Sequence, residues 1–325
     1  MTKAIVMYQT GGPEVLQWED FDPGAPQPGE ALVRHEAVGL NFIDVYHRTG
    51  LYPLAGLPAV IGMEGAGIVK AVGDGVSDIR PGDRVAYAGV PPGAYAEKRV
   101  IPAHRLVKVP EPIPLETAAG MMLRGMTARY LLKGCYPVGR DTTLLIHAAA
   151  GGVGTIVCQW AKALGAVVIG TVGSEEKAEL ARRNGCDYPV LYTHPTWIEA
   201  VRNITDGKGV DVVYDSVGKA TFMESLACLR PMGMMVSFGQ SSGKIPPLDT
   251  AILAQKGSLF LTRPSLMTYT AGRQDLLAHA DDLFQIVAEG AVKIHIGQTY
   301  ALKDARQAHL DLEGRKTRGS TVLMV

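Results

Sequence analysis

Residues 144–164 read LLIHAAAGGVGTIVCQWAKAL, an apolar run followed by a glycine-rich turn and a run of helix-forming residues. Two glycines of the turn keep the spacing of the last two in a G-x-G-x-x-G fingerprint, and an alanine stands at the first position. Glycine lets the backbone approach a pyrophosphate, and the helix start offers unpaired N–H groups and partial positive charge. The stretch therefore predicts a dinucleotide site at Gly151, Gly152, Val153 and Gly154.

Alternating strand-like and helix-like segments follow this stretch as far as residue 262. Short apolar runs between helices indicate parallel strands buried on both faces, which is typical of a doubly wound α/β sheet. We therefore expect a Rossmann domain. The expected strands are residues 144–146, 167–172, 188–192, 210–214, 234–238 and 259–262, and the expected helices are 155–164, a segment from 174, 197–204 and 221–229.

The two ends of the chain have a different texture. The first 120 residues or so are rich in glycine and proline, which indicates a compact, irregular β domain. Its expected strands include residues 31–35, 67–72 and 84–88. The tail after Pro264 no longer alternates, so we expect it to return to the first domain. Its expected elements are a helix at 276–289, a short run at 298–301 and a strand at 321–325.

The composition indicates a globular chain without a strong charge. Its 325 residues are about twice the usual single-domain size, which favours two domains. Lys plus Arg and Asp plus Glu number 32 each, so no net field would draw the protein to nucleic acid or to an anionic membrane. The N-terminal apolar run is too short for a signal peptide, and no stretch approaches the roughly 18 apolar residues of a membrane span. We therefore expect a cytoplasmic protein. The four cysteines lie far apart, which argues against a disulfide framework and against a zinc ribbon.

The second strand of the predicted sheet ends where NADH and NADPH are distinguished. An NAD-specific fold places a carboxylate there for the ribose hydroxyls, whereas this chain has Gly173 and Ser174, with Lys177 one helical turn later. A hydroxyl and a cation without a facing carboxylate suit a 2′-phosphate, so we predict NADPH as the cofactor. Glu175 and Glu176 leave an alternative open: they complement the dipole of the helix that they begin, or one of them binds a ribose diol.

Several linked motifs resemble the medium-chain dehydrogenase/reductase superfamily. In the first domain these are GMEGAGIV at 62–69, VGDGV at 72–76 and PGDRV at 81–85. Others resemble its quinone oxidoreductase, or zeta-crystallin-like, branch. They read NFIDVY at 41–46, LYP at 51–53, HAAAGGVG at 147–154, YDSVG at 214–218, FGQSSG at 238–243 and TRPSL at 262–266. The resemblance spans both ends of the chain.

The resemblance implies a domain order and an assembly. It places a GroES-like catalytic domain at residues 1–125, an NADPH-binding Rossmann domain at 126–262 and a return to the catalytic domain at 263–325. It also implies a homodimer with NADPH in a cleft between the domains. The apolar run Leu259-Phe260-Leu261 at the expected sheet edge is our candidate for the dimer contact.

The resemblance also bears on metal binding. Zinc alcohol dehydrogenases of this superfamily have a histidine ligand where this chain has Met63 and a cysteine ligand where it has Asn41. Their cluster of closely spaced cysteines is absent from the matching region, residues 93–97. Zinc requires three or four Cys, His or carboxylate ligands, so we expect a zinc-independent protein with no metal site.

Cofactor contacts follow from the resemblance, residue by residue. The nicotinamide end is assigned to Asn41, Phe42, Tyr46 and Tyr130, and the adenosine phosphate to Gly173, Ser174, Lys177 and Tyr192. The remaining contacts are Ser216, Phe238, Gly239, Ser241, Pro264, Ser265, Leu266 and Arg315. Tyr130 and Phe238 are equally well interpreted as core aromatics, and Arg315 as part of a solvated basic turn. His147 is interpreted as a packed or hydrogen-bonded structural residue.

The implied activity is the NADPH-dependent reduction of quinones. A quinone is already a strong electron acceptor, so holding it in position contributes more than a Lewis acid would. We assign Asn41 as a polar orienter and Tyr46 and Tyr52 as pocket walls or hydroxyl donors, with solvent as the final proton source. Asp44 is expected to fix the loop.

Two alternatives stay open. The same scaffold serves enzymes that reduce the double bond of enones and alkenals with NADPH. A non-catalytic NADPH-binding protein, either crystallin-like or an RNA binder, belongs to a different class. The balanced charge and the absence of a basic aromatic platform count against RNA.

Overall fold

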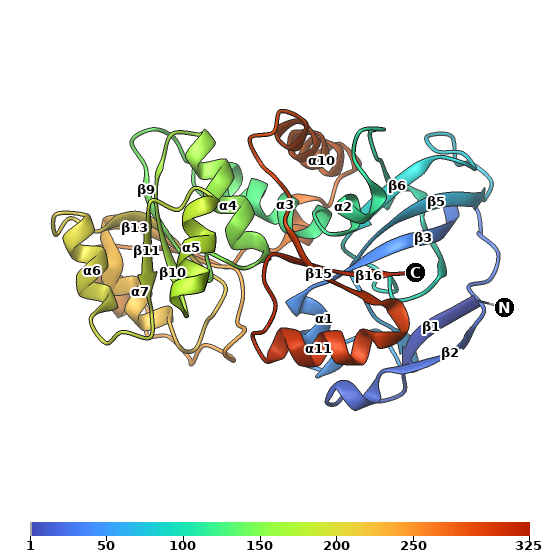
Figure 1. Ribbon diagram of the computed structural model, residues 1–325, viewed down its shortest axis with the longest axis horizontal. Coiled ribbons are helices and arrows are strands. Elements are labelled where there is room, and N and C mark those ends of the chain that lie inside the picture. Colours follow the sequence, from blue (N-terminus) through green and yellow to red (C-terminus); the bar gives the residue numbers. More distant parts are fainter. Residues whose placement is uncertain (1) are drawn as a thin grey trace. The chain divides into compact units, whose positions relative to one another are not determined.

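The computed structural model describes residues 2–325, and its contacts divide the chain into two compact units (Figure 1). Unit 1 comprises the residues up to Met126 together with Tyr269–Ala288 and Ile294–Val325, and unit 2 comprises Thr127–Thr268 and Glu289–Lys293. Each unit encloses a hydrophobic core of its own. Among residues 2–325, no helix combines the length and the apolar character that crossing a membrane requires.

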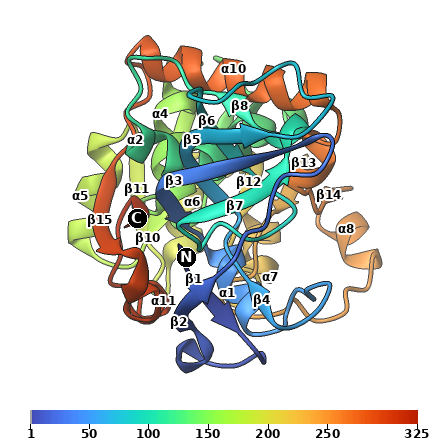
Figure 2. The ribbon, with the colours of Figure 1, turned by 90° about the vertical axis from the view of Figure 1, so that its right-hand side faces the viewer.

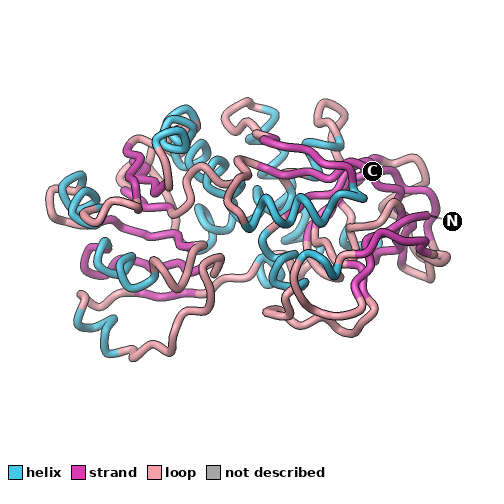
Figure 3. The backbone as a smooth tube through the Cα atoms, turned by 60° about the horizontal axis from the view of Figure 1, so that its bottom comes forward, coloured by secondary structure: helices cyan, strands magenta, loops and turns pink. Residues whose placement is uncertain are grey.

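Unit 2 contains a six-stranded parallel sheet with the order β11-β10-β9-β12-β13-β14. Helices α4 and α5 cover one face of this sheet, and α6 and α7 cover the other (Figures 1 and 3). The chain starts at the sheet centre with β9 and adds β10 and β11 on one side. It then returns to the centre with β12 and adds β13 and β14 on the other side, which confirms the predicted doubly wound fold. The strands are β9 (Thr143–Ile146), β10 (Val167–Val172), β11 (Tyr188–Leu191), β12 (Val210–Asp215), β13 (Leu229–Ser237) and β14 (Phe260–Thr262). The helices are α4 (Gly152–Ala163), α5 (Glu175–Arg183), α6 (Trp197–Ile204), α7 (Phe222–Cys228), α8 (Ala251–Gln255) and α9 (Leu266–Tyr269), preceded by a π-helical turn, η3 (Tyr130–Cys135).

The central strands of unit 2 are apolar because both of their faces are covered. Leu144, Leu145 and Ile146 of β9 are completely buried. Leu145 belongs to a cluster with Ile169 of β10 and Val213 of β12, so neighbouring strands share one core. Burial of this kind explains why short runs without polar alternation predict the strands of this sheet.

Unit 1 contains a seven-stranded sheet and a three-stranded sheet. The larger sheet follows the path β15-β16-β3-β5-β6-β8, with β7 also paired to β3, and the smaller has the order β2-β1-β4 (Figure 2). The strands are β1 (Thr2–Met7), β2 (Gln17–Phe21), β3 (Glu30–Leu40), β4 (Ala59–Val60), β5 (Glu64–Val72), β6 (Arg84–Ala88), β7 (Lys98–Pro102), β8 (Val107–Lys108), β15 (Ile296–Ala301) and β16 (Ser320–Met324). The helices are α1 (Phe42–Arg48), α2 (Leu115–Ala119), α3 (Met122–Arg129), which ends in unit 2, α10 (Arg273–Ala288) and α11 (Ala305–Glu313), with 3-10 turns η1 (Pro13–Val15), η2 (Ala103–Arg105) and η4 (Leu302–Asp304).

Strand β3 is longer than the predicted strand at 31–35. The polar pair His35 and Glu36 interrupts the apolar pattern, yet His35 is completely buried. Its ring nitrogens lie 2.6 Å from the carbonyl oxygen of Ala96 and 2.8 Å from the hydroxyl of Tyr87. These partners allow a histidine inside the core. A hydropathy pattern does not reveal them, so it ends the strand too early.

Other elements of unit 1 are absent from the sequence prediction. These are β1, β2, β4, β7, β8, α1, α2, α3 and α11, and α10 begins at Arg273 instead of 276. Helix α11 buries Ala305, Ala308 and His309. Two of these side chains are small and the third is polar, so the helix has the right spacing but little hydropathy contrast.

Candidate active site

The glycine-rich turn of unit 2 leads into helix α4. Gly151 is the N-cap residue, and Gly152, Val153 and Gly154 begin the helix. A Cβ atom on Gly154 would lie 2.3 Å from the carbonyl oxygen of Ala148, so only glycine fits. The first N–H groups of a helix have no acceptor within it, and no side chain caps those at the start of α4. The turn therefore has the geometry of an anion site at the carboxyl edge of the sheet.

Gly173, Ser174, Lys177 and Tyr192 lie together where β10 ends and α5 begins. Ser174 is the N-cap of α5, and its Oγ accepts a hydrogen bond from the backbone N–H of Lys177 at 3.3 Å. A Cβ on Gly173 would lie 2.9 Å from the hydroxyl oxygen of Tyr192. Two hydroxyl groups, a lysine and a glycine without side-chain bulk thus come from one small region of the backbone, and this set suits a 2′-phosphate.

The loops after β12 and β13 form the next part of the same sheet edge. The N–H of Ser241 donates to the carbonyl of Ser216 at 3.1 Å, and the N–H of Phe238 donates to the carbonyl of Asp215 at 2.8 Å. A Cβ on Gly239 would lie 2.6 Å from the carbonyl oxygen of Ser216. The four predicted residues of these loops are therefore neighbours, and Phe238 is partly exposed, outside the core.

The loop after β14 carries Pro264, Ser265 and Leu266. Just before it, the Arg263 guanidinium donates to the carbonyl oxygen of Ser237 at 3.1 Å and to that of Gly239 at 2.9 Å. These bonds tie the end of β14 to the end of β13. Leu266 is buried, whereas Ser265 is exposed.

His147 and Tyr130 are both buried inside unit 2. The ring nitrogens of His147 lie 2.8 Å from the hydroxyl oxygens of Thr171 and Ser225, and burial lowers the pKa of this histidine. The structural interpretation of His147 is therefore confirmed. Tyr130 begins the π-helical turn and is only 3% exposed, as its interpretation as a core aromatic requires.

Asn41, Phe42, Tyr46 and Tyr52 lie together in unit 1. Asn41 is the N-cap residue of α1, and Phe42 and Tyr46 follow on that helix. The ring centroids of Phe42 and Tyr46 are 5.7 Å apart, and those of Tyr46 and Tyr52 are 5.0 Å apart with a tilt of 60°. Such spacings are favourable for aromatic pairs. The Asn41 amide therefore begins the helix that carries two of these three aromatic rings.

A buried ion pair holds the Asn41 side chain. Its Nδ2 donates to a carboxylate oxygen of Glu64 at 2.7 Å, and Nη1 of Arg124 lies 3.5 Å from the same oxygen. The N–H of Leu123 donates to the other Glu64 oxygen at 2.8 Å, and Arg124 also donates to the carbonyl of Leu40. Burial raises the pKa of Glu64, and Arg124 opposes this rise. Because its amide nitrogen is engaged, the orientation of Asn41 is fixed.

Asp44 holds the backbone of the same loop. Its carboxylate accepts the backbone N–H of Asn41 at 2.8 Å and the hydroxyl of Tyr95 at 3.1 Å. Burial raises the pKa of Asp44 from 3.8 to about 7 in spite of these bonds. The prediction that Asp44 fixes the loop is confirmed.

The positions that correspond to zinc ligands are occupied by other chemistry. Met63 is 1% exposed and presents a thioether, and the Asn41 amide is committed to Glu64. Among residues 2–325, no group of three His, Cys, Asp or Glu side chains is placed to hold a metal ion.

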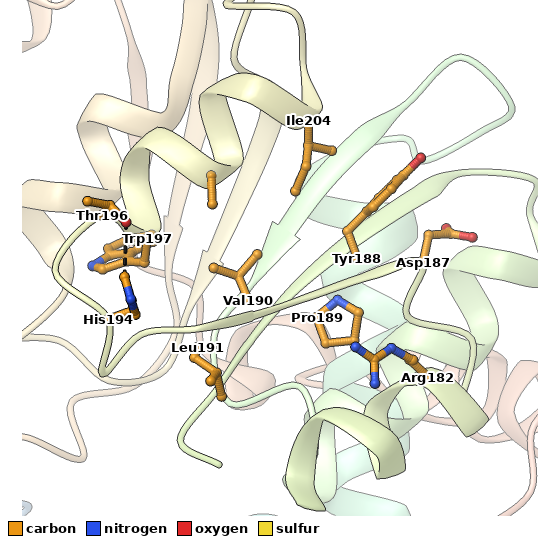
Figure 4. A pocket seen from close by; sticks show the side chains of 11 residues that line it. Arg182, Asp187, Tyr188, Pro189, Val190, Leu191, His194, Thr196, Trp197 and Ile204 are labelled. Carbon is orange, nitrogen blue, oxygen red and sulfur yellow. Dashed lines mark hydrogen bonds between the residues drawn. The ribbon is translucent and has the colours of Figure 1, made fainter. Parts of the chain in front are cut away.

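A pocket of about 410 Å³ lies elsewhere in unit 2, along the edge strand β11 (Figure 4). Trp197 and Ile204 of α6 line one side, and Tyr188 and Arg182 line the other. None of the predicted site residues belongs to its lining. Its walls are mostly apolar, and it lacks the backbone N–H groups of the glycine turn, so this pocket is not the candidate active site.

Three further residues of unit 1 bear on the predicted site: Arg315, Glu64 and Arg124. Arg315 is exposed in the turn after α11, with a φ of 58°. Glu64 and Arg124, which hold Asn41, are absent from the sequence prediction of the site. Each is a single charge in an otherwise apolar run, GMEGAG and MMLRGM. A charged side chain within an apolar run is rarely buried without a partner, so this pattern was the available sequence signal for a buried ion pair.

Comparisons with known proteins agree with both units. The family model described as zinc-binding dehydrogenase matches residues 152–289, and that described as alcohol dehydrogenase GroES-like domain matches residues 27–111. A quinone oxidoreductase of Pseudomonas aeruginosa is 50% identical, with 100% of each chain covered. A 2-haloacrylate reductase of Burkholderia sp is 45% identical, over 100% of this chain and 99% of the relative. The structure of Escherichia coli quinone oxidoreductase complexed with NADPH has a TM-score of 0.98 at 47% identity and covers 99% of this chain and 100% of its own.

A sequence identity of 45–50% over the full length agrees with the motifs quoted above and with the sheets found in both units. The chain belongs to the quinone oxidoreductase family of the medium-chain dehydrogenases/reductases.

Proposed function

We propose that this chain is an NADPH-dependent oxidoreductase that reduces quinones without a metal ion. The observation that carries the proposal is the Asn41 amide, which Glu64 fixes at the start of α1, the helix that carries the packed rings of Phe42 and Tyr46. A fixed polar group together with aromatic rings suits a planar acceptor with carbonyl oxygens.

The residues at the sheet edge of unit 2 fit NADPH. Gly154 packs so closely on the Ala148 carbonyl that no Cβ fits, which holds the start of α4 against the glycine turn where a pyrophosphate would bind. Ser174, Lys177 and Tyr192 would supply donors to the 2′-phosphate. The loop residues Ser216, Phe238, Gly239, Ser241, Pro264, Ser265 and Leu266 would hold the rest of the dinucleotide, with Tyr130 and Arg315 as further contacts.

The proposed site residues of unit 1, Asn41, Tyr46 and Tyr52, have different roles in the reaction. Bound NADPH would supply the electrons of the reduction. The Asn41 amide orients the acceptor, and its engagement with Glu64 keeps it from turning away. Tyr46 and Tyr52, whose rings pack on each other, would wall the acceptor site or donate hydroxyl hydrogen bonds, with solvent as the final proton source. A quinone needs no Lewis acid for this step, because positioning supplies most of the rate.

Reduction of a conjugated carbon–carbon double bond is a second candidate. A relative at 45% identity is named 2-haloacrylate reductase, and an enone presents the same conjugated carbonyl to Asn41 as a quinone does. A non-catalytic, crystallin-like NADPH-binding role is the third.

Turnover assays separate these functions. Purified protein is mixed with NADPH and, in parallel, with a simple benzoquinone, a naphthoquinone, cyclohexenone and 2-chloroacrylate, and the oxidation of NADPH is followed by absorbance. Turnover of the quinones above that of the alkenes supports the proposal. Faster turnover of the alkenes favours the second candidate, and NADPH binding without any turnover favours the third. An Asn41→Ala variant is expected to lose activity and to keep most of its NADPH affinity, because most of the assigned cofactor contacts lie in unit 2.

We also propose a homodimer in the cytoplasm. Strand β14 forms an edge of its sheet, and its Phe260 and Leu261 are 58% and 39% exposed, which invites pairing with a second copy. No two of the four cysteines, all within the described chain, are joined by a disulfide, which suits a reducing compartment.

A further inference from the structure

A single file of hydrogen-bonded side chains, Arg48, His309, Tyr95 and Asp44, crosses the core of unit 1. The guanidinium of Arg48 donates to Nδ1 of His309 at 3.0 Å. Nε2 of His309 lies 3.1 Å from the hydroxyl of Tyr95, which donates to Asp44 at 3.1 Å. All four side chains are at most 1% exposed. The file reaches the surface at Glu313, which accepts two bonds from Arg48, at 2.8 Å and 2.9 Å, and whose side chain is 34% exposed.

The direction of every bond in this file follows from Arg48. A guanidinium has only donors, so Nδ1 of His309 must accept. A neutral imidazole then carries its proton on Nε2 and donates to the oxygen of Tyr95, whose own proton is left for Asp44. Burial and the neighbouring Arg48 lower the pKa of His309 to about 3, so the ring is neutral.

The same chemistry excludes a proton relay from the surface. A relay requires each member to pass a proton on, and arginine does not lose its proton in proteins. Arg48 therefore closes the file at its outer end. The file can fix the position of Asp44 but cannot deliver protons to it.

We propose that Tyr95, His309 and Arg48 are positioning residues for Asn41, which they hold through Asp44. Asp44 accepts the backbone N–H of Asn41 while Glu64 accepts its side-chain Nδ2, so two carboxylates hold this residue from separate elements. Helix α11, more than 260 residues away in sequence, thereby sets the orientation of the amide. The proposal rests on the proposed function only where it assigns Asn41 to the acceptor.

The ionisation of Asp44 makes this proposal measurable. The charged groups that face Asp44 are Glu64 of β5, which raises its pKa, and Arg124 of α3, which lowers it. The Tyr95 hydroxyl lowers the pKa as well, and His309 behind it is neutral. Loss of the Tyr95 hydroxyl should therefore move the pKa of Asp44 upward, because a donor to the charged form is removed.

The test uses the full-length protein, labelled with nitrogen-15, and two amide signals of Asn41. The backbone N–H reports the charge of Asp44, and the side-chain amide reports whether that charge reaches the functional group. In the wild type both signals should titrate together near pH 7. Asp44→Asn should abolish both titrations, and Tyr95→Phe should move both to higher pH.

Two further variants control for a purely structural effect. Tyr87 is as buried as Tyr95 and bonds to His35 at 2.8 Å, but neither its hydroxyl nor His35 bonds to the file. Tyr87→Phe should lower the melting temperature and leave the Asn41 titration at the wild-type pH. His309→Leu should resemble Tyr95→Phe, whereas His309→Gln, which keeps an acceptor and a donor, should restore part of the wild-type behaviour.

Kinetics give the functional arm of the experiment. At neutral pH, Tyr95→Phe should lower kcat with a quinone roughly tenfold and leave KM for NADPH nearly unchanged, since one hydrogen bond to a charged group is lost. A backbone signal that titrates while the side-chain signal does not would overturn the proposal, as would a Tyr87→Phe variant that shifts the pH like Tyr95→Phe. If both signals titrate as expected but no acceptor is turned over, the proposed function fails and the positioning role stands.

Discussion

Replacement of Gly154 by alanine tests the close approach on which the dinucleotide site depends. The added Cβ would lie 2.3 Å from the carbonyl oxygen of Ala148, and real Cβ atoms essentially never come closer than 3.0 Å to such an atom. Both sides of this contact are backbone, so the turn and the helix must separate by about 0.7 Å. Overpacking of this kind costs about 1–3 kcal/mol.

The matched control is Gly151→Ala. Its Cβ would lie 3.1 Å from the same oxygen, and Gly151 has an ordinary extended conformation. A shift of a few tenths of an ångström accommodates it, and the entropy that alanine removes from the unfolded chain offsets about 0.4–1 kcal/mol.

The assay combines thermal unfolding without ligand and titration with NADPH. Gly154→Ala should lower the melting temperature by roughly 2–4 °C for each kcal/mol, and weaken NADPH binding by about tenfold or more as the N–H groups of the turn move. Gly151→Ala should stay close to the wild type in melting temperature, whereas its added Cβ can still weaken NADPH binding, because Gly151 belongs to the turn that the pyrophosphate approaches. Equal behaviour of the two variants would refute the reasoning from the Ala148 contact.

Four other outcomes are expected. Lys177→Ala should weaken NADPH binding roughly ten- to a hundredfold and hardly affect NADH in paired titrations, because only NADPH has the 2′-phosphate; equal losses would make Lys177 a scaffold residue. Phe260→Asp should convert a dimer to a monomer in light scattering, and a wild type that is already monomeric at micromolar concentration would contradict the assignment of β14. Purified protein should contain no stoichiometric zinc by elemental analysis and keep its activity in chelator, because Met63 and Asn41 replace ligands; one tightly bound zinc per chain would count against this. Asp44→Asn should raise the free energy of unfolding at pH 8 by up to about 4 kcal/mol, because the wild type loses stability as the pH rises from 3.8, the unfolded-state pKa of Asp44, to its folded-state pKa of about 7. In urea unfolding this gain should vanish below pH 4. A gain that is the same at every pH would show that ionisation of Asp44 is not its cause.

The sequence predicts unit 2 much better than unit 1. In unit 2 the strands are covered on both faces, so apolar runs coincide with strands, as β9 and β10 do. The fingerprint glycines also lie where the spacing places them. In unit 1 the core contains His35, Arg48 and His309, and their burial depends on partners from distant parts of the chain.

The same reasoning explains which site residues were found. Asn41 and Tyr46 follow from a local motif, NFIDVY, which the structure folds into one N-cap and one short helix. Glu64, Arg124 and Tyr95 act through contacts with residues 23 to 84 positions away, and no local pattern encodes such contacts. A single charge within an apolar run was the one signal that pointed to Glu64 and Arg124, and no such signal marks Tyr95.

The place of β16 beside β3 has a consequence for the making of the protein. A ribosome must add about 200 residues after Met126 before β16 can pair with β3, which takes on the order of 10–40 s at roughly 5–20 residues per second. Throughout this time the β3 edge at Val38 and Leu40 lacks its partner and exposes backbone groups to other nascent chains. The strands of unit 2 lie in one continuous segment and are complete much earlier. Chaperone demand during translation should therefore come chiefly from the first 126 residues, the part synthesised first and completed last.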